Sequence, residues 1–115
     1  MDARETELRF YRTSDGREPF VEWLDELRDA RARQKIQARL VRVRLGNFGD
    51  CEPVGQGVLE LKINFGPGYR IYFGRDGNEI VILLCAGDKS SQQNDIKNAK
   101  ACWEDYKREK NHADL

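Results

Sequence analysis

The sequence predicts a small α+β domain, and the prediction depends on how helical and extended patterns are distributed over its 115 residues. Helical periodicity is confined to residues 19–46 and to the stretch after residue 90, whereas three extended runs follow one another between residues 59 and 85. Such segregation favours an antiparallel or mixed sheet with helices on its faces. We expect the order β-α-α-β-β-β-α, with a mainly antiparallel sheet, a helical hairpin on one face and a C-terminal helix.

The first half of the chain predicts an edge strand and the helical hairpin. Residues 7–12 alternate in polarity, as a short strand does, and Asp15-Gly16 marks a turn after it. A first helix, from Pro19 to about Asp29, has apolar residues at positions i, i+3, i+4 and i+7, namely Phe20, Trp23, Leu24 and Leu27. A second helix stops at Gly46-Asn47 and has its apolar stripe at Ala32, Ile36, Leu40 and Val43.

Basic charge is concentrated in the second predicted helix. The whole chain has 20 basic and 20 acidic residues, so no overall field draws it to nucleic acid or to a membrane. Residues 31–45, however, hold six basic residues and no acidic one. Four of them line one side of the helix: Arg31, Lys35, Arg39 and Arg42. This stripe is either an ordinary solvated face or a phosphate-binding surface, and in the second case Arg39 and Arg42 contact the substrate.

Residues 59–92 are the centre of the predicted fold. The first two extended runs alternate apolar with polar residues across a Gly66-Pro67-Gly68 corner, which predicts an antiparallel hairpin. The third run, Ile80 to Cys85, has no alternation and predicts a central strand covered on both faces. We expect residues 48–56, before this meander, to form a surface loop. One face of the first two strands then carries five polar residues: Glu60, Lys62, Asn64, Arg70 and Tyr72. This face is a candidate site, although a half-solvated sheet surface has the same pattern.

The last helix is predicted to follow Ser90, because Ser90 and Gln93 have the spacing of a capping box. Its apolar stripe is Ile96, Ala99, Trp103 and Tyr106. Asp95 falls in the first turns, where a carboxylate interacts favourably with the helix dipole, and this structural role stands beside a role in the site. We expect a single domain over residues 1–108 and a polar, frayed tail over residues 109–115.

Several classes of chemistry are excluded by residue type and spacing. The single histidine, His112, belongs to the predicted tail, so no Ser-His or Cys-His nucleophile is assembled. Neither the cysteines nor the carboxylates have metal-ligand spacing, and we expect no metal and no cofactor. No stretch has the length and apolarity of a membrane span, so we expect a cytoplasmic protein with no membrane contact.

A cationic site remains, built from Lys62, Arg70 and Lys89, with Tyr72 and Asp95 near it. Such a site suits a phosphodiester, because its transition state gathers negative charge that prearranged cations stabilise. A lysine among other cations is also expected to have a lowered pKa, since a like charge disfavours the protonated form. It could then act as a general base on a ribose 2′-hydroxyl.

The motifs at these positions resemble a known family. The strings LELK over residues 59–62, GPGYRIYF over residues 66–73, GDKSSQ over residues 87–92 and Asp95-Ile96 are similar to the HigB-type addiction module killer branch of the RelE/ParE toxin superfamily. The resemblance implies the RelE-like fold and a type II toxin–antitoxin module. It also implies a ribosome-dependent endoribonuclease that cleaves mRNA by 2′-hydroxyl attack. The implied partners are the ribosome, mRNA and a cognate antitoxin, which we expect to be a helix-turn-helix protein.

The resemblance also assigns roles to residues. It gives Lys62 as the base, Arg70 as the phosphate-binding residue and Lys89 as the acid, and we expect substrate contacts from Tyr72, Gln92 and Asp95. The sequence departs from the family at two positions. Glu60 stands where ribosome-dependent relatives have a basic residue, and Asp95 stands where those relatives can have a tyrosine. The ParE branch shares the fold but inhibits DNA gyrase without cutting RNA, so a non-enzymatic toxin is the alternative. We also expect an acidic antitoxin segment to dock on the basic helix.

Overall fold

The computed structural model describes residues 4–113 and has an α+β architecture, as the sequence predicts. Its strands are β1 (Glu7–Phe10), β2 (Cys51–Gly55), β3 (Val58–Ile63), β4 (Tyr69–Asp76) and β5 (Ile80–Asp88). Its helices are α1 (Pro19–Glu26), α2 (Ala30–Arg44) and α3 (Gln92–Ala113), and a short 3₁₀ turn, η1 (Lys89–Ser91), precedes α3. The strands form one sheet in the order β1-β5-β4-β3-β2. Only β1 and β5 are parallel among these pairs, so the sheet is mixed and mainly antiparallel.

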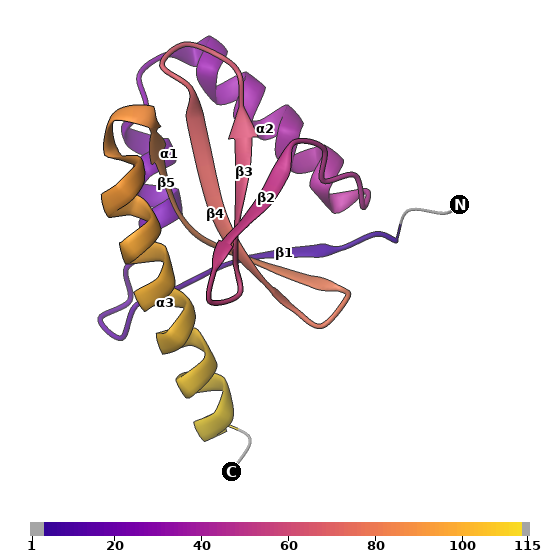
Figure 1. Ribbon diagram of the computed structural model, residues 1–115, viewed down its shortest axis with the longest axis vertical. Coiled ribbons are helices and arrows are strands. Elements are labelled where there is room, and N and C mark those ends of the chain that lie inside the picture. Colours follow the sequence, from indigo (N-terminus) through magenta and orange to yellow (C-terminus); the bar gives the residue numbers. More distant parts are fainter. Residues whose placement is uncertain (1–3, 114–115) are drawn as a thin grey trace.

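The two faces of the sheet are covered by different helices (Figure 1). Phe20 of α1 and Ile36 of α2 are buried with Val81 and Leu83 of β5 on one face. On the other face Ile82 and Leu84 of β5 are buried with Ala99 and Trp103 of α3. Strand β5 is therefore covered on both faces, which explains its uninterrupted apolar sequence and confirms that part of the prediction.

Strand β2 was expected to be a surface loop, and that expectation is wrong. It pairs antiparallel with β3, with Cys51 opposite Leu61 and Pro53 opposite Leu59. The hairpin closes through Gln56 and Gly57, both of which have positive φ (57° and 85°). Because β2 is one of the two edge strands, it can contain a proline and polar residues, and it therefore lacks the apolar alternation by which strands are predicted.

The helices of the hairpin begin and end for local reasons. Asp29 caps α2, and its carboxylate accepts hydrogen bonds from the backbone N–H groups of Arg31 (3.0 Å) and Ala32 (3.2 Å). After α2 the chain turns at Gly46, which has φ of +89°. A Cβ atom there would lie 2.3 Å from the carbonyl oxygen of Arg4, so the predicted glycine stop is also required by packing.

Helix α3 differs from the prediction at both ends. The cap is Asp88 rather than Ser90: the Asp88 carboxylate accepts from the N–H of Ser90 (2.8 Å), η1 follows, and α3 starts at Gln92. The helix also continues to Ala113 instead of ending at Arg108, and Lys110 in this extension pairs with Asp76 of β4. Residues 114–115 of the predicted tail lie outside the described residues. No helix in residues 4–113 is both long enough and apolar enough to cross a membrane.

Trp103 is the larger of the two buried hydrophobic side chains that α3 contributes to the core, the other being Ala99. Its side chain is buried, stacks on Tyr106 with centroids 5.3 Å apart, and lies so close to Gly74 that a Cβ there would be 2.4 Å from the ring. We expect Trp103→Ala to lower the free energy of unfolding by about 3–5 kcal/mol, because it removes a large core side chain. Denaturant unfolding measures this loss.

The control is Phe10→Ala, which truncates an aromatic side chain that is 46% exposed. This variant should lower the free energy of unfolding far less. If Trp103→Ala unfolded like the wild type, α3 would not depend on this contact.

Candidate active site

The predicted polar face of β3 and β4 exists, but most of it is not open to solvent. Glu60 pairs with Tyr72 and Lys62 pairs with Arg70 in the strand register, so the four side chains share one face. Glu60 and Tyr72 are nevertheless 1% and 0% exposed. The beginning of α3 covers this part of the face, where Gln92 donates a hydrogen bond to Glu60 (2.9 Å).

Glu60 is the centre of a buried polar network. One of its carboxylate oxygens, Oε2, accepts hydrogen bonds from the hydroxyl of Tyr72 (2.9 Å) and from Nε2 of Gln92 (2.9 Å). The same oxygen lies 3.8 Å from Nε of Arg70, a buried nitrogen with no hydrogen-bond partner among the described residues. Burial, and then the bond to Glu60, raise the pKa of Tyr72, so the phenol remains a donor.

This network contradicts the expectation for Tyr72 and gives Gln92 a structural contact, while a substrate contact from the partly exposed Gln92 stays a prediction. Tyr72 was expected to contact substrate, but it is fully buried and its hydroxyl is used by Glu60. Gln92, expected to do the same, directs its amide to Glu60 from the first residue of α3. The unusual Glu60 thus has a structural explanation, because it supplies the negative charge beside the buried Nε of Arg70.

Arg70 reaches the surface at the glycine corner. Its side chain is 14% exposed, and one terminal nitrogen donates to the carbonyl oxygen of Gly68 (2.7 Å). Gly68 has φ of +82°, and a Cβ atom there would lie 3.2 Å from the same guanidinium. The corner therefore needs glycine both for its backbone conformation and for the approach of Arg70.

The three predicted catalytic residues line one surface hollow, which we call the cationic hollow. Lys62 of β3, Arg70 of β4 and Lys89 of η1 converge there, and the corner at residues 66–68 forms one wall. Lys89 is exposed, whereas Arg70 is held from behind by Glu60. The sequence prediction that these three cations come together is confirmed, while their chemical roles remain a prediction.

Lys62 does not have the lowered pKa that was expected of a lysine among cations. Its Nζ lies 2.8 Å from the carboxylate of Glu52 on β2. This hydrogen bond, and then the charge of Glu52, raise the pKa of Lys62. The expectation failed because Glu52 belongs to the strand that the sequence analysis treated as a loop. In the free protein Lys62 is therefore an ammonium cation paired with a carboxylate.

Asp95 has an internal role. Its carboxylate accepts a hydrogen bond from Oγ of Ser91 (2.5 Å). The same carboxylate packs against Gly87, where an added Cβ atom would lie 1.9 Å from Oδ2 of Asp95. Asp95 lies in the first turn of α3, where the sequence analysis placed a carboxylate that favours the helix dipole, and it also packs the start of α3 against the end of β5. The expected contact between Asp95 and substrate has no support in this geometry.

The basic stripe of α2 is shorter than expected. Arg39 is only 8% exposed, donates to the carbonyl oxygen of Asp50 (3.1 Å), and has its pKa lowered by burial. It lies three residues after Ile36 and four before Val43, so it falls on the buried side of the helix. Arg42 is exposed, as expected of a substrate contact, but Arg39 is not available for one.

A small mixed sheet with helices on both faces and a cationic hollow at one end is consistent with an α+β toxin fold. Residues 22–112 match the phage-derived Gp49-like protein family (DUF891), and the chain belongs to that family. It is a family of toxins from toxin–antitoxin modules, related to the RelE/ParE superfamily, and it implies an antitoxin partner. The chain is also 51% identical over 81 residues to an uncharacterized protein of Haemophilus influenzae, covering 70% of this chain and 82% of that protein.

The buried network yields a prediction about stability. Glu60→Ala should lower the free energy of unfolding by about 3–5 kcal/mol, because it leaves the Arg70 charge without its buried partner. The matched control is Glu52→Ala, which removes a paired but exposed carboxylate from the neighbouring strand and should leave stability nearly unchanged. Equal losses in the two variants would contradict a special role for Glu60.

Proposed function

We propose that this protein is a HigB-type toxin that cleaves mRNA on the translating ribosome. The observation that carries the proposal is the cationic hollow, in which Lys62, Arg70 and Lys89 meet from three separate elements. Membership of the Gp49-like family supports the toxin class, and the hollow supports phosphodiester chemistry. Such a toxin acts in the cytoplasm and is held inactive by a cognate helix-turn-helix antitoxin.

The proposed reaction is an intramolecular displacement at phosphorus. The ribose 2′-oxygen attacks, the bond from phosphorus to the 5′-oxygen of the next nucleotide breaks, and a 2′,3′-cyclic phosphate and a 5′-hydroxyl are formed. Arg70 is fixed by Gly68 and Glu60, so its guanidinium is already oriented to stabilise the charge that develops on the phosphate. Lys89, exposed at the mouth of the hollow, donates the proton to the departing 5′-oxygen.

Lys62 takes the proton of the 2′-hydroxyl in this scheme, and Glu52 controls whether it can do so. Paired with Glu52, Lys62 is protonated and acts only as a cation. The base form requires that the pair open when the substrate phosphate enters. The same observation favours a second candidate function, a ParE-like toxin that inhibits gyrase by binding alone, because that activity needs no base.

Lys89 offers the cleanest test of the nuclease. Lys89→Ala removes an exposed side chain, so the fold should be retained, yet cleavage should fall on the order of a hundredfold or more and growth arrest should be lost. The assay is translation of a defined mRNA by purified ribosomes, followed by mapping of 5′ ends. Lys97→Ala, which removes an exposed lysine from α3 outside the hollow, should cut like the wild type.

Arg70→Lys extends this test to the phosphate contact, since it keeps a positive charge but loses the planar donor geometry, and it should also cut poorly. Growth arrest by the wild type with intact mRNA and broken DNA would refute the nuclease and support the gyrase alternative.

The pairing of Lys62 with Glu52 generates a further prediction. Because Glu52 raises the pKa of Lys62, Glu52→Gln should return that pKa toward its ordinary value and increase the fraction of neutral lysine at neutral pH. If Lys62 is the base, the cleavage rate rises, by up to about tenfold for each pKa unit removed. Single-turnover cleavage at fixed pH measures this, with Glu79→Gln, an exposed carboxylate outside the hollow, as control. Slower cleavage by Glu52→Gln would contradict the assignment of Lys62 as base.

A further inference from the structure

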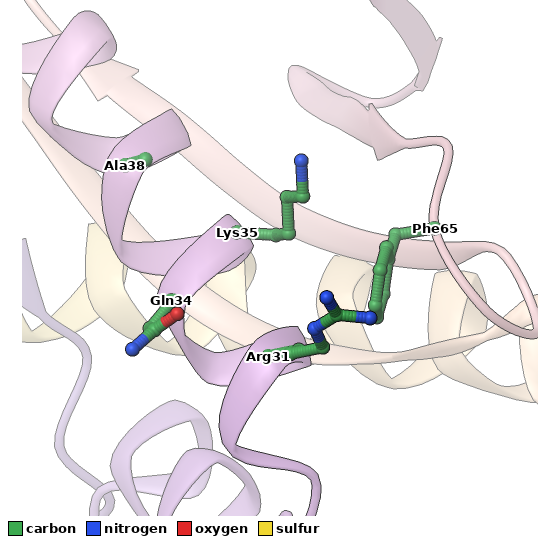
Figure 2. Close-up of a pocket in the computed structure, with 5 residues that line it drawn as sticks. All are labelled: Arg31, Gln34, Lys35, Ala38 and Phe65. Atoms are coloured by element: carbon green, nitrogen blue, oxygen red, sulfur yellow. The ribbon is translucent and has the colours of Figure 1, made fainter.

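A groove runs beside α2 and has two cations of the helix facing an aromatic ring. Arg31, Lys35 and Ala38 of α2 form one wall, and Phe65, just beyond the end of β3, forms the other. Arg31 and Lys35 extend from the helix toward the Phe65 ring, whereas Gln34 points away from it (Figure 2). Nζ of Lys35 lies 5.9 Å from the ring centroid, within the range of a cation–π contact. We call this feature the α2 groove.

The α2 groove continues into the cationic hollow. Past Lys35 and Phe65 the depression is lined by Arg42, Lys62 and Asn64. Lys62 and Asn64 in turn line the cationic hollow. The α2 groove, its continuation and the cationic hollow therefore adjoin one another at shared lining residues, and we call the three together the trough.

The trough is strongly cationic. None of the ion pairs within residues 4–113 involves Arg31, Lys35 or Arg42, so these three charges are not neutralised there. Among the described residues that line the groove and its continuation, Asp50 is the one acidic residue. The groove therefore suits a polyanion, although the chain as a whole has no net charge.

We propose that the α2 groove binds a single RNA strand next to the scissile phosphate, with a base stacked on Phe65 and backbone phosphates at Arg31, Lys35 and Arg42. An aromatic platform beside a cationic track is the usual basis of single-strand recognition. An acidic protein segment would also be attracted by the charge. Continuity with the cationic hollow favours RNA, because a strand cut in the hollow must leave it along a neighbouring surface. The inference rests on the proposed nuclease and names where its substrate lies.

The contribution of the charges is tested by measuring the affinity for a fluorescent single-stranded oligoribonucleotide. Its length of about 12 nucleotides is within the range that one single-strand-binding domain covers. All proteins carry Lys89→Ala to prevent cleavage. The groove pair Lys35→Gln/Arg42→Gln is compared with Arg33→Gln/Arg44→Gln, which removes the same charge from exposed positions of α2 outside the trough. Each phosphate contact to a single strand contributes about 0.7 to the slope of log affinity against log salt concentration. We therefore expect the groove double variant, which loses two contacts, to have a slope shallower by about 1.4. The slope of the control double variant should change little.

The aromatic contribution is tested by Phe65→Leu, which keeps an apolar side chain against the core but removes the ring. Affinity should fall roughly five- to hundredfold, with the salt slope unchanged. Equal effects of the two charge pairs would overturn the proposal. It would also be wrong if the groove pair abolished binding of a polyglutamate peptide but left RNA binding intact. If the oligoribonucleotide bound in the groove as expected while the wild-type protein, with Lys89 intact, left ribosomal mRNA uncut, the nuclease would fail and the groove assignment would stand.

Discussion

One buried carboxylate organises this protein. Glu60 lies in β3, receives hydrogen bonds from the neighbouring strand β4 and from α3, and balances the charge of Arg70, so it joins the β3–β4 hairpin to a helix that is distant in sequence. A lone charge at 1% exposure would be very costly, and this one is stable only because each partner is already in place. The orientation of Arg70 is therefore built into the core of the fold, and in the proposed reaction its guanidinium would need no reorganisation to meet a phosphate.

The sequence predicted most of the fold because its signals are local. The stripe of α2, the glycine corner at residues 66–68 and the apolar run of β5 each have a period or turn chemistry that defines the element. Strand β2 was missed because an edge strand with Pro53 has no such signal. The length of α3 was underestimated because its last turns are polar and are held partly by a contact with Asp76, which no local pattern reveals.

The site was predicted less completely, because it depends on contacts that no local sequence pattern reveals. Residue types and alternation were enough to predict that Lys62, Arg70 and Lys89 lie close together. They were not enough to tell an open polar face from one covered by α3, so Tyr72 was assigned to substrate although it is buried. A lowered pKa was considered for one lysine among the cations, but the pKa of Lys62 is raised, since its partner Glu52 is on the unrecognised strand. Positions that depend on contacts between distant segments need the tertiary structure.

The parallel pairing of β1 with β5 limits when this protein can become a folded toxin. Glu7 lies opposite Ile80, so the first strand has no partner until most of the chain has been synthesised. Lys89 and Gln92, which complete the hollow and the network behind it, come later still. Because synthesis proceeds from the N-terminus, a nascent chain still inside its own ribosome lacks the sheet and the assembled site. The topology thus delays assembly of the hollow until residues 80–92 have emerged from the ribosome, so that the sheet, the hollow and the network behind it form together rather than one after another.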